Sequence, residues 1–201
     1  MIIPVDKEKV MAEFETKYVE GRFEEEYPRI QEKIDKDKEV IKAEVISKFK
    51  VACNKAKNLQ KKNLKNEIQY IYISFLRTSI MQNLGKCRID LYDDKWFLDK
   101  EECSIDIDFS FIYEPLFVFI EELQERKKQY GRTITEMDVD KIKLKEGDRY
   151  HAIGIKLLKT LVNDLVECTE YKEMEKSDDI SIFAGKYRDE AVLIYETPKE
   201  K

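Results

Sequence analysis

The sequence predicts an α+β fold that is predominantly helical, in which a long N-terminal helical arm or hairpin packs with a helical body carrying a small antiparallel β-sheet. Three observations lead to this class. Charged residues make up 39% of the chain, against six glycines and four prolines, which favours helices with solvated faces. Apolar residues recur every three or four positions through the N-terminal third, as on one side of a helix. Short runs that alternate apolar and polar residues follow in the middle and at the end, as in half-buried strands.

The first helix is expected over residues 6–26. Asp6 is a suitable N-cap residue, because its side chain can accept hydrogen bonds from the first free amides. Pro28 is expected to break the helix or to start the next one, since it has no amide hydrogen. The apolar residues that share one side of this helix are Val10, Met11, Phe14, Tyr18 and Val19.

A second, long helix is expected over residues 28–63. Its apolar residues form a narrow stripe of the coiled-coil type, which predicts a long helix in a hairpin or bundle. They are Ile30, Ile34, Ile41, Val45, Phe49, Ala52, Ala56 and Leu59. We therefore divide the chain into a helical arm, residues 1–65, and an α+β body, residues 66–201, with one continuous domain as the alternative.

Residues 68–81 are apolar on almost every side, so periodicity does not separate a buried helix from a strand. The β-branched and aromatic residues favour a strand, whereas the length of the segment and Gly85 as a stop signal favour a helix. We interpret the segment as a helix. In either conformation it is expected to be the most buried part of the molecule.

The strands are expected in the middle and at the end of the body. Residues 87–99 contain two alternating runs around Asp93 and Asp94, which predicts a β-hairpin. Residues 104–111 alternate strictly, with Asp106 and Asp108 on one side and apolar residues on the other. Two short strands over 180–184 and 191–195 would complete the antiparallel sheet.

The remaining helices are expected between these strands. One begins at Pro115, a residue favoured at the first helical position, and stops at Gly131. Another begins at Thr135, is interrupted near Gly147, and restarts at Asp148 to run to residue 168.

Composition limits the environment and the cofactors of the protein. No apolar run approaches the roughly 20 residues that cross a bilayer, and the N-terminus lacks the features of a signal peptide, so we expect a cytoplasmic protein without a membrane segment. The four cysteines form no CxxC pair, and the chain has one histidine. We therefore expect neither zinc nor disulfides, but four reduced and mostly buried thiols. No motif indicates a cofactor.

Two acidic residues and one arginine are candidates for a ligand site. Asp106 and Asp108 would lie on one side of a strand, about 7 Å apart, close enough to hold a divalent metal. This pair resembles the DxD of metal-dependent nucleotidyltransferases, but the glycine-serine motif that precedes it there is missing, since Gly85 is followed by Lys86. Arg77 is the single charged residue of 68–81, and it would need an acidic partner or an anionic ligand if buried. A solvated strand face and a structural ion pair are the simpler interpretations.

Three further side chains are candidates for ligand or partner binding. Arg149 and His151 lie close together on a helix, a combination suited to acid–base work or to phosphate binding, although no nucleophile is nearby. Trp96 lies beside the charged turn of the predicted hairpin, where it either covers the core or, if exposed, anchors a partner.

The charge is strongly polarised along the chain. Residues 42–65 contain eight lysines and one acid, whereas residues 90–125 contain twelve acids and two lysines. We expect the lysine helix to face the acidic region, within one molecule or across a dimer. The basic residues that could instead bind an acidic protein or nucleic acid are Lys55, Lys57, Lys61 and Lys62. Few arginines and aromatic residues accompany them, and the chain has a net charge of -5, which both disfavour nucleic acid.

These observations favour an interaction or regulatory protein without a recognisable catalytic motif. The sequence contains no Walker loop, GxGxxG, GxSxG, HExxH or EF-hand loop. The expected partner is another protein or a second copy of the chain, as in a dimer. The alternatives are a metal-dependent enzyme or binder of phosphate-containing or nucleotide ligands that uses Asp106, Asp108 and Arg77, and nucleic-acid binding through the lysine helix.

Overall fold

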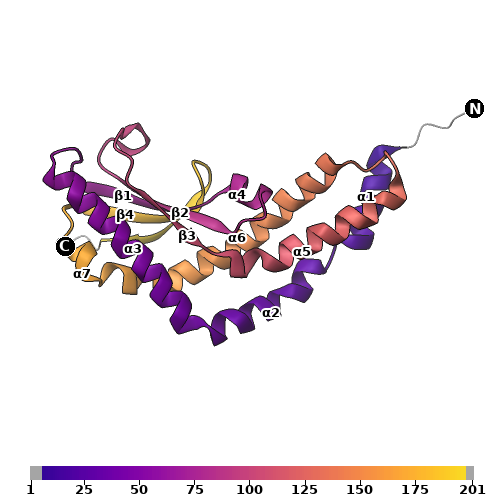
Figure 1. Ribbon diagram of the computed structural model, residues 1–201, viewed down its shortest axis with the longest axis horizontal. Helices are drawn as coiled ribbons and strands as arrows, with labels where there is room; N and C mark the ends of the chain where they lie inside the picture. The colour runs from indigo at the N-terminus through magenta and orange to yellow at the C-terminus, as the bar shows by residue number, and fades with distance from the viewer. Residues whose placement is uncertain (1–5, 198–201) are drawn as a thin grey trace, which may run out of the picture.

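The computed structural model describes residues 6–197 and consists of a five-stranded sheet with helices packed on one of its faces (Figure 1). The α-helices are α1 (Lys7–Tyr18), α2 (Arg22–Lys36), α3 (Lys38–Lys61), α4 (Arg77–Met81), α5 (Ser110–Arg126), α6 (Glu136–Val166) and α7 (Thr169–Glu173). The strands are β1 (Ile68–Phe75), β2 (Lys86–Tyr92), β3 (Ser104–Asp108), β4 (Lys176–Lys186) and β5 (Ala191–Glu196), and two 3-10 helices are η1 (Trp96–Leu98) and η2 (Lys127–Tyr130). The predicted class, a mainly helical α+β fold, is confirmed.

The sheet has the strand order β3-β2-β1-β4-β5. The pairs β1–β2, β2–β3 and β4–β5 are antiparallel, as predicted, but β1 and β4 are parallel, so the sheet is mixed. In the centre, Ile71 of β1 lies opposite Leu91 of β2 and Ile182 of β4. The two strands predicted at the end of the chain are therefore both present, and one of them lies beside the central strand.

The helix predicted over 68–81 is wrong, because most of this segment is the central strand β1. Ile71, Ile73 and Phe75 point to the helices, while Tyr70 and Tyr72 lie on the other face. A central strand that carries large side chains on both faces has no polar side, which is why its sequence resembled that of a buried helix. The expectation that residues 68–81 are the most buried part of the molecule is only partly met. The three inward-facing side chains of β1 are at most 1% exposed, but Arg77, Thr78 and Met81 of α4 are exposed.

The N-terminal helices break at other places than predicted. Asp6 caps α1 as expected, but the chain turns at Gly21, with φ +82°, and Pro28 lies inside α2. The long second helix is in turn divided at Asp37 into α2 and α3, which meet at a bend (Figure 1). The bend lets both halves of the predicted stripe reach the core. Its buried members are Ile30, Ile34, Ile41, Val45, Phe49, Ala52 and Ala56.

The predicted hairpin over 87–99 is half correct. Its first run is β2, but the second run forms the 3-10 turn η1, and β2 pairs instead with β3. The strand predicted over 104–111 ends at Asp108, whose Oδ1 accepts a hydrogen bond of 2.8 Å from the amide of Ser110. Helix α5 then begins at Ser110, ahead of Pro115, which lies inside it.

The interruption predicted near Gly147 is absent, because α6 is continuous. Thr135 caps it as predicted, in a capping box with Asp138. A Cβ on Gly147, inside α6, would lie 3.6 Å from Ile80 and 3.8 Å from Leu116, which are ordinary contact distances. The glycine therefore neither ends the helix nor is required by its packing.

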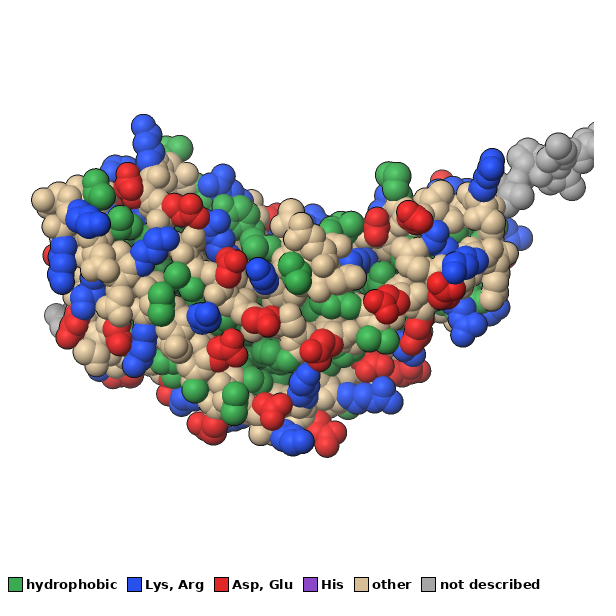
Figure 2. Space-filling model, viewed as in Figure 1, with side chains coloured by type: hydrophobic (Ala, Val, Ile, Leu, Met, Phe, Trp, Pro, Cys, Tyr) green, Lys and Arg blue, Asp and Glu red, His purple; other side chains and the backbone are tan. Residues whose placement is uncertain are grey.

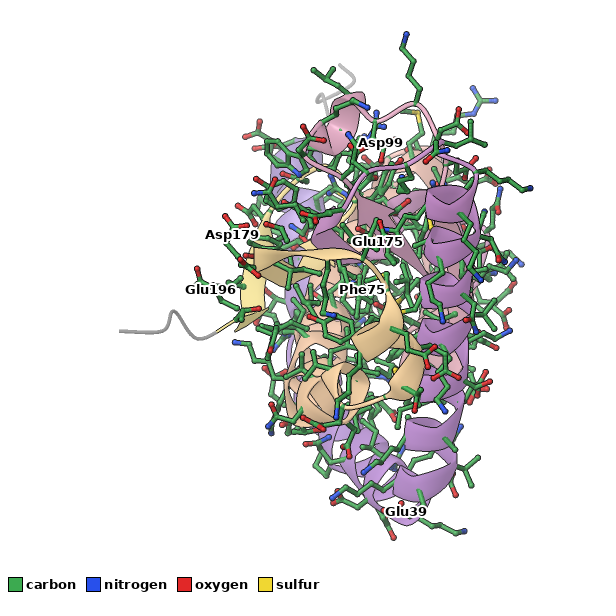
Figure 3. All side chains as sticks on the ribbon, turned by 90° about the vertical axis from the view of Figure 1, so that its left-hand side faces the viewer. Glu39, Phe75, Asp99, Glu175, Asp179 and Glu196 are labelled. Atoms are coloured by element: carbon green, nitrogen blue, oxygen red, sulfur yellow. The ribbon has the colours of Figure 1, made fainter. Side chains whose placement is uncertain are left out.

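One apolar core extends between the helices and the inner face of the sheet. Figure 3 shows Phe75 in this interior, where its ring stacks on His151 at a centroid distance of 5.0 Å. Buried residues of the arm, such as Phe14 and Phe49, belong to the same cluster as those of the body. Among residues 6–197, no helix is long and apolar enough to cross a membrane.

Candidate functional site

The outer face of the sheet, turned away from α3 and α6, carries a row of aromatic side chains. Tyr72 of β1 lies opposite Phe183 of β4, and their rings stack at 4.9 Å. The ring of Phe97 lies 5.4 Å from that of Tyr72 and 5.3 Å from that of Tyr92. We call the set the aromatic face. Its members are Tyr70, Tyr72, Tyr92, Trp96, Phe97 and Phe183.

Trp96 is the exposed member of this face. It stacks on Phe97 at 4.5 Å, and its indole Nε1 donates a hydrogen bond of 3.1 Å to the hydroxyl of Tyr72. The residue remains 45% exposed, and its backbone has φ +55°, which is uncommon for a large side chain. Such a conformation costs free energy and persists where the surrounding contacts determine it.

A buried polar network fixes the loop that carries Trp96. Lys65, at the end of the arm, forms an ion pair with Asp99 and donates a hydrogen bond of 2.8 Å to the carbonyl of Glu101. Asp93 is fully buried and accepts a hydrogen bond of 3.0 Å from the amide of Lys95. Figure 3 shows Asp99 at the end of the molecule where this loop lies. Because buried contacts of Asp93 and Asp99 fix the chain before and after Trp96, the folded structure itself keeps the indole exposed.

Charged groups of both signs lie beside the aromatic face. Arg88 donates a hydrogen bond of 2.8 Å from Nε to Oδ1 of Asp90 and reaches Glu102 at 3.0 Å. Asp90 is 2% exposed, and its Oδ2 has no hydrogen-bond partner among the described residues. Burial raises the pKa of Asp90, and the hydrogen bond from Arg88 acts in the opposite direction. The guanidinium of Arg188 lies 5.6 Å from the ring of Phe97.

Asp106 and Asp108 both lie on the outer side of β3, as predicted, and both are exposed. Asp106 lies opposite Arg88, and Asp108 accepts a hydrogen bond from the amide of Ser110, the first residue of α5. Within residues 6–197, no group of three or more His, Cys, Asp or Glu side chains could hold a metal ion. The two aspartates are thus separate surface carboxylates, each with a neighbour of its own.

Arg77 lies on the surface, not inside an apolar segment. β1 ends at Phe75, and Arg77 begins the short helix α4, where it is exposed and forms no ion pair with a described carboxylate. The hypothesis of a buried guanidinium is wrong, because the apolar segment ends before the arginine. Its use as an anchor for an anionic ligand remains a prediction.

Arg149 and His151 point to different places. Arg149 forms ion pairs with Glu24 and Glu146 and lies 4.2 Å from the ring of Phe23, so it joins α6 to α2. His151 is 3% exposed, and its Nδ1 lies 2.5 Å from the hydroxyl of Tyr113. Burial lowers the pKa of His151 to about 4, which keeps the imidazole neutral near pH 7. Both residues hold the helices together, and they form no joint site.

The lysine helix pairs mainly with a different acidic region than predicted. Lys42 reaches Asp164 at 2.6 Å and Lys57 reaches Glu173 at 2.5 Å, so these acids come from α6 and α7. Of the region 90–125, Asp99 alone pairs with a described lysine of 42–65, namely Lys65. Lys55 donates to the carbonyl of Ser104, while Lys61 and Lys62 are exposed. Figure 2 shows basic side chains gathered over α3 with acidic ones among them.

The sequence pointed to Trp96 but not to the rest of the aromatic face. Tyr70 and Tyr72 were hidden in the segment interpreted as a helix, although their alternation with Ile71 and Ile73 is the pattern of a strand. Phe183 is distant in sequence, and the parallel pairing of β1 with β4 brings it beside Tyr72.

The fold and the aromatic face define an α+β protein with a five-stranded mixed sheet, one face covered by helices and the other left open by them. Comparisons with protein-family models, with curated proteins and with solved structures give no match for this chain.

Proposed function

We propose that this protein is a non-catalytic interaction protein that binds a protein partner through the aromatic face of its sheet. The observation that carries the proposal is Trp96, which is 45% exposed on a backbone with φ +55° and is held there by the buried pair of Lys65 and Asp99. Exposed tryptophan and tyrosine side chains, set in a rigid surface, are typical centres of protein interfaces.

The charges beside the aromatic face favour a protein over a nucleic acid. Stacked aromatic rings can bind bases, but nucleic-acid sites surround such rings with unpaired cations that meet the phosphates. Here Arg88 is paired with Asp90 and Glu102, and the neighbouring Asp106 adds a further negative charge, which leaves Arg188 beside Phe97 as the one arginine at this face without an ion pair among the described residues. Lysines of α3 are likewise paired with acids of α6 and α7. A mixed surface of this kind suits a polypeptide.

The test uses the purified protein as bait in a quantitative capture from its source cells. Proteins retained by the wild type should be lost from Trp96→Ala, since removing a central tryptophan costs about 2 kcal/mol or more, roughly a 30-fold weaker affinity. The matched control is Val40→Ala, a change of a 70% exposed side chain on α3. Figure 3 labels its neighbour Glu39 at the end of α3 remote from Asp99.

The fluorescence emission of Trp96 can also be used to measure a binding curve for any retained protein. Trp96 is the single tryptophan of the chain, so its emission should shift to shorter wavelength as a partner covers it. Equal capture by the wild type and by Trp96→Ala, with folding of both verified by circular dichroism, would rule out the proposed site.

No contact among the described residues favours the metal-dependent alternative through Asp106, Asp108 and Arg77, and it remains a weaker proposal.

A further inference from the structure

The turn between β4 and β5 places Arg188 beside the aromatic face. The Cζ atom of its guanidinium lies 5.6 Å from the centre of the Phe97 ring and 5.4 Å from that of Tyr187. A guanidinium that is attracted to aromatic rings is held in position, while its N–H groups remain available for hydrogen bonds. Figure 1 shows this turn and the loop of η1 on the same side of the sheet, away from α5 and α6.

Arg188 keeps a positive charge that the neighbouring cations share with carboxylates. Arg88 has two carboxylate partners, and Lys95 lies 3.5 Å from Asp93. Arg188 is exposed and forms no ion pair with a described residue, although Asp189 follows it in the chain. Its backbone has φ +53°, a conformation that persists where surrounding contacts determine it. The guanidinium is therefore a positioned donor for a group from outside the molecule.

Exposed apolar side chains lie near this guanidinium. Trp96 stacks on Phe97, the ring on which Arg188 also lies. Leu193 is 46% exposed and is paired with Phe183, so it extends the aromatic face onto β5. Side chains at alternate positions of an extended segment are about 7 Å apart, and those one turn apart on a helix are about 5–6 Å apart. One short segment of a partner can thus reach both Arg188 and Trp96.

We propose that the partner docks on the aromatic face with a segment in which an aspartate or glutamate lies two to four positions from a large apolar residue. This inference rests on the proposed function and names the chemistry of the partner. The carboxylate accepts hydrogen bonds from Arg188, and the apolar side chain covers Trp96. A phosphate group, with nearly two negative charges, would meet a single free cation beside the carboxylates of Glu102 and Asp106, so it fits this surface less well.

Selection from a displayed library of random peptides tests the proposal on the full chain. The wild type should enrich peptides that carry an acid close to an apolar residue. Arg188→Glu reverses the charge and should enrich peptides with lysine or arginine beside the same apolar residue. The matched control is Arg132→Glu, since Arg132 is an exposed arginine of the loop before α6 without an ion pair to a described residue. It should enrich the same peptides as the wild type.

The affinity of one enriched peptide measures the ion pair itself. Fluorescence anisotropy of the dye-labelled peptide should show roughly fivefold weaker binding to Arg188→Gln than to the wild type. Replacing the acid of the peptide by its amide should weaken binding to the wild type by a similar factor. The same replacement should have little effect on binding to Arg188→Gln, because the pair is already lost there.

The outcomes separate this inference from the proposed function. Apolar peptides without an acid that bind the wild type and Arg188→Glu alike, but not Trp96→Ala, would overturn the acidic partner and leave the aromatic face as the binding site. Tighter binding when phosphoserine replaces the acid would also overturn it, as would a library that yields no enriched peptide. Peptides that bind Trp96→Ala as well as the wild type would contradict both proposals.

Discussion

At the scale of single residues, Lys65 is the side chain with the clearest energetic role. Its ammonium group is enclosed with Asp99, and the side chains of the two residues are 0% and 3% exposed. Lys65→Met should lower the free energy of unfolding by roughly 3–5 kcal/mol, because it leaves a buried carboxylate without its cation. Urea unfolding followed by circular dichroism measures the change.

The control for this variant is Lys62→Met, which removes an exposed lysine three positions earlier and should change stability by less than about 0.5 kcal/mol. Equal losses in the two variants would show that the pair with Asp99 is not the cause. A further readout is the emission of Trp96, which should alter in Lys65→Met because the loop that carries the indole loses its anchor.

Lys65 also shows what a local pattern cannot predict about single residues. The sequence suggested a buried cation at Arg77, inside an apolar segment, and placed Lys65 at the end of a lysine helix that was expected to face the acidic region 90–125. The structure has the reverse arrangement, since Arg77 is exposed and Lys65 is 5% exposed. The partner of Lys65 lies in a loop after β2, and only the folded chain brings the two together.

At the scale of elements, two glycines of α6 should respond oppositely to the same substitution. A Cβ at Gly154 would lie 2.5 Å from Cζ of Phe75, a ring held between β1 and His151. Gly154→Ala should therefore destabilise the protein by about 1–3 kcal/mol, through overpacking. At Gly147 the nearest atom, on Ile80, would be 3.6 Å away, an ordinary contact. Gly147→Ala should stabilise the protein by about 0.5–1 kcal/mol, through helix propensity.

Thermal unfolding of the two variants beside the wild type checks this pair. Because both glycines lie inside one helix, the higher helix propensity of alanine stabilises both variants alike. It therefore cancels when the unfolding temperatures of the two variants are compared. A stabilised Gly154→Ala would mean that the ring of Phe75 can move aside.

The elements that the sequence predicted well are those whose signals are local. Asp6 and Thr135 cap helices as expected, and the alternation around Asp106 marks β3. The elements that it missed depend on distant contacts. β1 lacks a polar face because its inner side chains lie in the core and the rings of Phe97 and Phe183 pack on its outer ones. Pro28 and Gly147 are tolerated inside helices whose apolar residues are buried. The aromatic face was missed for the same reason, since it is assembled across three strands and a loop.

At the scale of the whole molecule, His151 should make stability depend on pH. Its pKa is lowered from 6.5 to about 4 by burial, with Lys186 and Arg77 acting in the same direction and Asp148 against it. In the unfolded chain the imidazole of His151 therefore binds a proton near pH 6.5, whereas in the folded protein it binds one only near pH 4. The contribution of neutral His151 to the free energy of unfolding is complete above pH 6.5 and is lost as the pH falls to 4. It amounts in total to a value on the order of 3 kcal/mol.

Urea unfolding at a series of pH values, for the wild type and for His151→Gln, isolates this contribution from that of the carboxylates. The difference between the two proteins should diminish from pH 7 to pH 4. Because the chain has one histidine, its imidazole resonances give the same pKa directly by NMR. A midpoint near the ordinary value, or a difference that stays constant with pH, contradicts the prediction.

The parallel pair of β1 and β4 has a consequence for the order of folding. Everything from α4 to α7 lies between these two strands in the chain, yet they are neighbours at the centre of the sheet. During synthesis β1 leaves the ribosome long before β4. In that interval one edge of β1 has no partner strand, and its apolar side chains can contact other chains. Until β4 is synthesised, the nascent protein can form hairpins and helices but cannot complete the centre of its sheet. We therefore expect the growing chain to need a chaperone during that interval.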